Sequence, residues 1–179
     1  MMKNILSLMI LILLCSCSGV SPAEYVKWVE DEENGLRKTK TVGEYEFNIQ
    51  YCPSSYLEIK RKLDKRDMSP DTEIIDGDSA FSFVFRIIRP AELADRAAFQ
   101  LINEENFRLV QGGDTCRSDL VLYENNFNIS PFESYSVLFD SKSHNCDFRF
   151  VYDGLALGTG PIIFSFKQKD VERLPQISN

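Results

Sequence analysis

The chain has 179 residues, 44% of them hydrophobic, and a formal net charge of -7. Once an N-terminal leader is set aside, about 160 residues remain, which is the size of one globular domain with its own core. The acidic balance argues against nucleic acid as a partner, because phosphates require a basic surface. No cluster of basic residues indicates a site for anionic lipid head groups.

Residues 1–16 have the pattern of a bacterial export signal. Lys3 precedes a ten-residue apolar run, Ile5 to Leu14, that is interrupted only by Ser7. As a helix this run would cover about 15 Å, roughly half of the hydrocarbon layer that a membrane-spanning helix crosses. The run therefore indicates a signal peptide rather than a membrane span.

The end of this run predicts a lipid anchor. The segment "LCSC" resembles the bacterial lipobox, in which an apolar residue at -3 and a small residue at -1 precede the cysteine that is diacylated. Cys17 fits with Leu14 and Ser16 at these positions, whereas Cys15 would have the bulky Leu14 at -1. Two or more acyl chains hold a protein firmly at a membrane. We expect Cys17 to be lipidated; an ordinary cleaved signal with incidental cysteines is the alternative.

Three further cysteines follow, and their odd number allows one intramolecular disulfide at most. An exported protein can keep a disulfide, and we predict one between Cys116 and Cys146, both near the starts of predicted strands. The alternative is that these two and Cys52 are all small, unpaired residues. Adding His144 would complete a Cys₃His set, but the cysteines are too far apart in the chain for a usual zinc site. We therefore expect no metal and no cofactor.

The first predicted element is a helix that begins after Ser21. Ser21 and Glu24 form a capping box, and Pro22 occupies the first helical position. Apolar residues recur on one face, and Asn34 with Gly35 ends the helix.

A hairpin is predicted next, with strands at residues 36–42 and 45–51 and a turn at Gly43. This register sets Lys40 opposite Phe47 and Lys38 opposite Ile49. Either the first strand is a sheet edge whose lysines reach around to solvent, or the turn is longer.

The segment "SYLEIKRKL" predicts a second helix, with Ser55 and Glu58 as a capping pair. The long segment "SAFSFVFRIIRP" predicts a central strand, because apolar residues occupy both of its faces. Residues 91–111 fit both helical and strand spacing, and we predict a short helical turn followed by a hairpin around Asn103–Asn106.

The remaining chain predicts strands at 119–124, 134–140, 146–152 and 161–167, a tight turn at Asp153 and Gly154, and a last helix near 170–174. The expected fold class is α+β: a mostly antiparallel β-sandwich or partly closed barrel of about eight strands with two or three flanking helices. The expected division is a signal peptide at 1–16, a lipidated tether at 17–20 and one globular domain at 21–179.

No motif indicates catalysis. "LGTGP" leads into a strand rather than a helix, so it predicts a turn and not a phosphate site. "DGD", Asp76 to Asp78, lacks the later positions of a calcium loop and predicts a solvated turn. His144 is the single histidine, and no serine or cysteine lies in a nucleophile elbow. We expect a non-catalytic protein; the alternative is an envelope hydrolase that uses acidic residues.

The segments "YVKWVEDEENGLRKTKTVGEYEFNIQYCPSSY" and "FVYDGLALGTGPIIFSFKQKDVERLP" resemble a family of small uncharacterised lipoproteins from the Bacteroidetes. The resemblance implies lipidation and an envelope location, and it implies no catalytic residues. Directly after Cys17 the chain has "SGVSP" instead of the acidic residues typical of surface-directed lipoproteins there. We therefore expect an outer-membrane lipoprotein on the periplasmic side, with surface display as the alternative, a binding or assembly role, and an envelope protein as a candidate partner.

Overall fold

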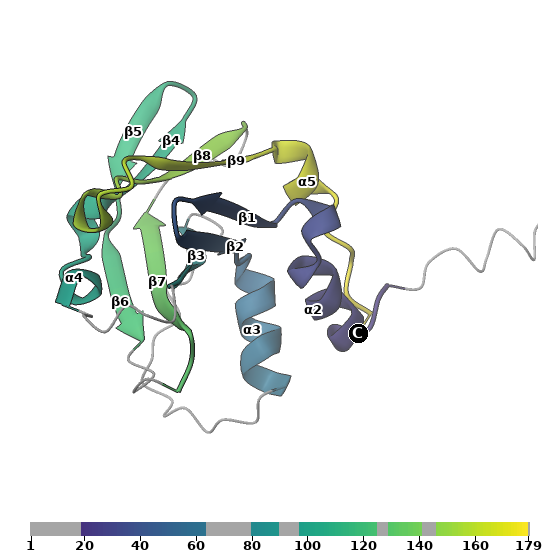
Figure 1. The fold of residues 1–179 in the computed structure, drawn as a ribbon. Coiled ribbons are helices and arrows are strands. Elements are labelled where there is room, and N and C mark those ends of the chain that lie inside the picture. Colours follow the sequence, from purple (N-terminus) through teal and green to yellow (C-terminus); the bar gives the residue numbers. More distant parts are fainter. Residues whose placement is uncertain (1–18, 64–79, 90–96, 125–128, 141–145, 179) are drawn as a thin grey trace, which may run out of the picture.

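The computed structural model describes residues 19–63, 80–89, 97–124, 129–140 and 146–178. These residues form an α+β fold in which two antiparallel sheets pack against each other (Figure 1). The five-stranded sheet has the order β1-β2-β3-β7-β6 and the four-stranded sheet the order β5-β4-β8-β9. The strands are β1 Arg37–Val42, β2 Tyr45–Tyr51, β3 Ala80–Ile88, β4 Phe107–Gln111, β5 Asp114–Arg117, β6 Leu120–Glu124, β7 Phe132–Asp140, β8 Phe148–Tyr152 and β9 Ile162–Phe166.

The predicted fold class is confirmed as a sandwich, and the barrel alternative is not, because the two sheets do not close on each other. The described residues contain nine strands, in line with the expected number of about eight. The sequence does not predict one of them, β5, a short and mostly exposed partner of β4. Its sequence, "DTCR", gives no apolar alternation that would have indicated a strand.

Aromatic side chains fill the space between the sheets. Phe81, Phe83, Phe85 and Ile87 alternate along β3 and are buried, which confirms β3 as the central strand of its sheet. The ring of Phe85 lies 5.2 to 6.1 Å, centroid to centroid, from the rings of Phe47, Phe107, Phe150 and Tyr152. Each fully buried side chain of this size contributes about 1.5–3 kcal/mol through the hydrophobic effect.

The β1–β2 hairpin has the predicted register, with Lys38 opposite Ile49 and Lys40 opposite Phe47. β1 is a sheet edge, and its lysines reach around the rim of the sandwich to β9. The amino group of Lys38 lies 5.4 Å from the ring centre of Phe166, and that of Lys40 donates a hydrogen bond of 2.6 Å to the carbonyl of Ile163. The alternative in which β1 is a sheet edge is therefore correct. The lysine charges also protect the edge strands β1 and β9 from pairing with strands of another molecule.

Helix α2, Pro22–Glu30, begins with the predicted capping box between Ser21 and Glu24. It is shorter than predicted, because a 3-10 turn at Glu32–Asn34 follows it before Gly35 adopts a left-handed conformation. Asp31 accepts a hydrogen bond from the backbone of Glu33 and so starts this separate turn.

Helix α3, Ser54–Leu63, lies beside α2 near the β1–β2 hairpin (Figure 1). The prediction that Ser55 caps α3 is wrong, because the helix already includes Ser54. The hydroxyl of Ser55 instead pairs with the hydroxyl of Tyr25 on α2 at 2.6 Å. The residue spacing within one helix does not predict which side chain of another helix it will contact.

The ambiguous segment before β4 contains the predicted helical turn, α4 at Ala97–Gln100, but not the predicted hairpin. Asn103 caps a 3-10 turn at Glu104–Asn106, and the chain then enters β4, which pairs with β5 and β8. Phe99 is buried from the helical turn rather than from a strand. The spacing between Phe99 and Phe107 therefore fits strand alternation only by coincidence.

Of the two C-terminal predictions, the last helix is confirmed with a shift of two residues, and the tight turn at Asp153 and Gly154 is wrong. Gly154 adopts a left-handed conformation, but a 3-10 turn at Leu155–Leu157 follows it, so β8 and β9 are joined by a loop rather than a tight turn. "LGTGP" lies in this loop and is a turn, as predicted. The last helix, α5, spans Gln168–Glu172 and begins two residues before its predicted start at residue 170. None of the described helices is long and apolar enough to cross a membrane.

Candidate functional site

Several residues that the sequence singled out lie outside the described residues: Cys17 with its lipobox, Asp76 to Asp78, and His144. Lipidation of Cys17 therefore remains a prediction. The predicted tether is described only from Gly19 onward. Val20 already belongs to the domain, because its backbone N–H donates to the carbonyl of Gln176 at 2.8 Å and its carbonyl accepts from the N–H of Ser178 at 2.9 Å.

The three described cysteines are free thiols, so the predicted disulfide between Cys116 and Cys146 is not present in the structure. Burial, together with nearby Asp119, raises the pKa of the Cys116 thiol. Cys52 is 2% exposed, and burial raises its pKa to about 12. At neutral pH this thiol is protonated and unsuited to act as a nucleophile.

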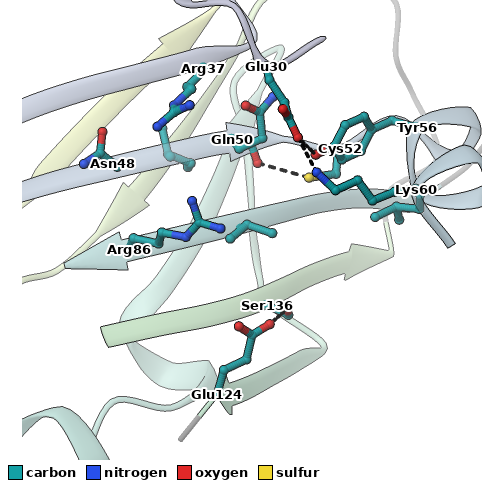
Figure 2. Close-up of a pocket in the computed structure, with 13 residues that line it drawn as sticks. Glu30, Arg37, Asn48, Gln50, Cys52, Tyr56, Lys60, Arg86, Glu124 and Ser136 are labelled. Carbon is teal, nitrogen blue, oxygen red and sulfur yellow. Dashed lines mark hydrogen bonds and ion pairs between the residues drawn. The ribbon is translucent and has the colours of Figure 1, made fainter. Parts of the chain in front are cut away.

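One pocket lies on the outer face of the five-stranded sheet, on the side away from the aromatic core. It has a volume of about 610 Å³ and is walled by α3 and the end of α2 (Figure 2). Strand alternation explains its floor: Phe83 and Phe85 point inward, so Val84 and Arg86 between them point outward. The lining residues are Glu30, Arg37, Asn48, Ile49, Gln50, Cys52, Tyr56, Leu57, Lys60, Val84, Arg86, Glu124 and Ser136.

A second, apolar pocket of about 210 Å³ adjoins the first along the same face. The two pockets share Cys52, Leu57, Val84 and Ser136. The second continues over Leu120, Leu122 and Leu138, and its surface is almost entirely apolar. We refer to the two pockets together as the outer-face groove.

The carboxylates of the groove are engaged by neighbouring side chains. Glu30 accepts hydrogen bonds from the ammonium of Lys60 at 2.5 Å and from the hydroxyl of Tyr56 at 2.7 Å. Burial opposes ionisation of Glu30, but these two hydrogen bonds outweigh it and lower the pKa of the carboxyl below its ordinary value. Glu124, on the other side of the pocket in Figure 2, accepts a hydrogen bond from Ser136 at 3.2 Å. The lowered pKa of Glu30 does not suit a general acid, which needs a raised pKa.

Arg86 differs from these groups because no ion pair in the described part of the chain neutralises it. It projects from the central strand β3 into the pocket, and its Nε is buried without a hydrogen-bond partner among the described residues (Figure 2). Its guanidinium carbon lies 5.2 Å from the ring centre of Phe132. A partly buried guanidinium that lacks an anion is costly, so a bound anion would stabilise it.

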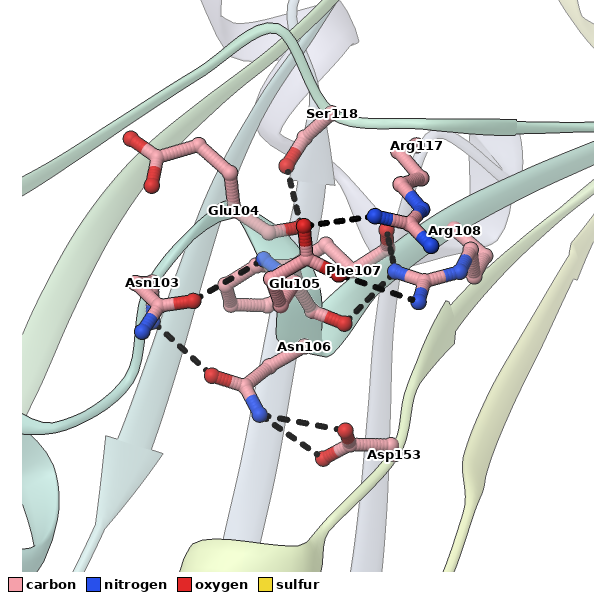
Figure 3. Close-up of polar contacts among 9 residues, drawn as sticks. All are labelled: Asn103, Glu104, Glu105, Asn106, Phe107, Arg108, Arg117, Ser118 and Asp153. Atoms are coloured by element: carbon pink, nitrogen blue, oxygen red, sulfur yellow. Dashed lines mark hydrogen bonds and ion pairs between the residues drawn. The ribbon is translucent and has the colours of Figure 1, made fainter.

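A polar network next to β4 is structural rather than a binding site (Figure 3). Asn106 donates to the carboxylate of Asp153 at 3.1 Å, and Arg117 donates to Glu105 at 2.6 Å. The hydroxyl of Ser118 donates to the backbone carbonyl of Glu104 at 3.1 Å. These bonds hold the 3-10 turn against the loop after β8, and they occupy the groups that a ligand would need.

A buried ion pair lies at the end of β3 and the start of β7. The Nε of Arg89 is 3.3 Å from Oε1 of Glu133, whose side chain is fully buried. These two atoms are close enough for an ion pair but are not aligned as a hydrogen bond. Tyr123 donates a hydrogen bond of 2.6 Å to the other oxygen of Glu133. No local sequence pattern predicts this pair, because its members are 44 positions apart.

The described residues contain no group of three histidine, cysteine, aspartate or glutamate side chains placed to hold a metal ion. Comparisons of the chain with protein-family models, with curated proteins and with solved structures find no match. Sequence reasoning also missed Arg86 as a site residue. The available signal was that Arg86 is the single charged residue in the otherwise apolar and serine-containing stretch Ala80–Ile88.

Proposed function

We propose that this protein is a bacterial envelope lipoprotein, anchored through Cys17, that acts by binding a component of the envelope in its outer-face groove. The observation that carries the binding role is Arg86, a cation in the groove without an ion-pair partner among the described residues. Binding sites are typically concave and mainly apolar, with a few polar groups that orient the ligand. The envelope location follows from the lipobox and from the resemblance to Bacteroidetes lipoproteins.

Binding is favoured over the hydrolase alternative by the state of the two groove carboxylates. Glu30 is held ionised by Lys60 and Tyr56, and Glu124 is hydrogen-bonded to Ser136. A glycoside hydrolase needs one protonated and one ionised carboxyl group facing a shared substrate. The lowered pKa of Glu30 does not suit the first of these roles.

Mass spectrometry of the membrane fraction tests the anchor. We expect an N-terminal peptide that begins at an acylated Cys17, and an unmodified N-terminus at any later residue would contradict the lipoprotein proposal. Photocrosslinking in cells tests the groove. A photoreactive amino acid at Leu122, which is 54% exposed, should capture a specific adduct.

The matched control places the same photoreactive group at Arg149, an exposed position on the outer face of the other sheet. Equal capture from both positions would argue against the groove as the binding site. Turnover in a glycan or peptide hydrolase screen, abolished by Glu30→Gln or Glu124→Gln, would replace the binding proposal with the hydrolase alternative.

A further inference from the structure

The outer-face groove changes from polar to apolar along the direction of its strands. Cross-strand pairing places Arg86, Ser134 and Glu124 in one row. It places Ser82, Leu138 and Leu120 in another row, which lies four residues away from the first row on each strand. At about 3.3 Å per residue the two rows lie roughly 13 Å apart. A ligand that fills the groove therefore has a polar end and an apolar end separated by that distance.

The polar end carries a net positive charge, because three cations line it, Arg37, Lys60 and Arg86, against two carboxylates, Glu30 and Glu124. Lys60 is neutralised by Glu30 at 2.5 Å, and Arg37 has only a long contact of 3.9 Å with Glu32. Arg86 has no ion-pair partner among the described residues. Figure 2 shows the guanidinium groups of Arg37 and Arg86 on either side of β2, and both residues line the pocket. A guanidinium binds a carboxylate or a phosphate with two parallel hydrogen bonds.

The apolar end favours an aliphatic chain. Three leucines that line it remain exposed: Leu57 by 41%, Leu120 by 40% and Leu122 by 54%. They come from α3 and β6, and they converge on one patch of the kind that marks a binding surface. The groove floor lies on β2, β3, β7 and β6, and of these strands β2, β3 and β7 pair with neighbours on both sides. Over these interior strands the floor offers an extended peptide no main-chain partners, whereas an aliphatic chain needs none.

We propose that the outer-face groove binds an amphipathic anion with one anionic head group on an aliphatic chain. The head group lies on Arg86, and the chain runs over Val84 toward Leu120 and Leu138. This inference rests on the proposed binding function and specifies its ligand class. The span of roughly 13 Å matches a medium-length acyl chain. The two pockets, about 610 and 210 Å³, are together of the size that holds such a ligand.

The test uses the full chain, purified as the cell produces it and placed in lipid nanodiscs, with dodecanoate carrying ¹³C in its carboxyl group. A fatty acid dissolved in lipid has a raised pKa, because desolvation disfavours its charge. A carboxylate bound to Arg86 keeps its charge to lower pH. We expect a second ¹³C signal, saturable with protein concentration, that titrates at lower pH than the lipid-dissolved acid.

Two variants test the two ends of the groove. Arg86→Gln should weaken binding about tenfold or more, because it removes a charge-assisted contact. Leu122→Asp, at an exposed position, should weaken it similarly by placing a charge beside the chain. Arg149→Gln is the matched control, since Arg149 lies exposed on an interior strand of the opposite sheet, and it should leave binding unchanged.

Competition experiments with dodecyl compounds that carry other head groups give the remaining outcomes. Strong competition by dodecyl phosphate against dodecanoate would support the proposal and indicate a phosphate-bearing lipid. Weak competition by dodecyl phosphate, with dodecanoate still bound, would also support the proposal and indicate a carboxylate ligand. Dodecanol competing equally well, no protein-bound signal from either anion, or an unchanged affinity of Arg86→Gln would each overturn it. Capture of a protein at Leu122 without lipid binding would leave the proposed function intact and overturn only this ligand class.

Discussion

A side chain on Gly19 would meet the backbone of Ser178: a Cβ there would lie 2.6 Å from the nitrogen of Ser178 and 2.7 Å from the carbonyl oxygen of Gln176. The C-terminal segment thus packs against the chain two residues after the predicted lipidation site. If Cys17 is lipidated as predicted, only residue 18 lies between the anchor and the described domain.

Gly19→Ala should destabilise the protein by about 1–3 kcal/mol, because the new methyl group overlaps backbone atoms that cannot move aside easily. The free energy of unfolding in urea measures this effect. Gly43→Asn is the control, because Gly43 has open space around its Cα and Asn tolerates its positive φ of 61°. Equal losses in both variants would show that the contact between Gly19 and Ser178 contributes nothing specific.

Glu133→Ala should cost about 3–5 kcal/mol, because it removes a fully buried carboxylate that pairs with Arg89 and accepts a hydrogen bond from Tyr123. Chemical denaturation measures the loss. The comparison is Glu105→Ala, which breaks an exposed pair with Arg117 and should cost about 1 kcal/mol or less. If the two losses were similar, burial would not control the strength of the pair.

Glu30 should make the stability of the protein depend on pH below its ordinary pKa of 4.5. Its pKa is lowered in the folded state, so its contribution is fully present above 4.5 and is lost as the pH falls through the lower folded value. Glu30→Gln should remove this part of the pH dependence between pH 4.5 and more acidic conditions. Unfolding curves across that range would contradict the assignment if wild type and variant lost stability in parallel.

Thiol labelling distinguishes the three cysteines. Cys52 is almost fully buried with its pKa raised to about 12, so it should react with iodoacetamide only after unfolding. Cys116 and Cys146 are partly exposed free thiols and should react in the native protein. Intact-mass measurement counts the added groups. Two protected cysteines that become reactive only after reduction would instead support the disulfide that the sequence suggested.

Local chemistry predicted much of the fold. The capping box at Ser21, the β1–β2 register and the alternation of Phe81, Phe83 and Phe85 are all properties of neighbouring residues. Predictions from the sequence were wrong where a contact between residues far apart in the chain decides the local structure. Ser55 binds Tyr25 on another helix, and β5 is a strand only because β4 supplies its partner.

The sequence by itself predicted two things about this protein: an anchor at Cys17, from the lipobox-like segment, and a fold of packed strands, from the alternating aromatic residues. Those signals are local, because a signal peptide is recognised as a linear segment and a strand buries every second side chain. Only the tertiary structure decided the groove. Arg86, Glu30 and Leu122 come from β3, α2 and β6, and packing alone brings them together. Packing also determines which charge is neutralised, since Lys60 pairs with Glu30, whereas Arg86 has no ion-pair partner among the described residues.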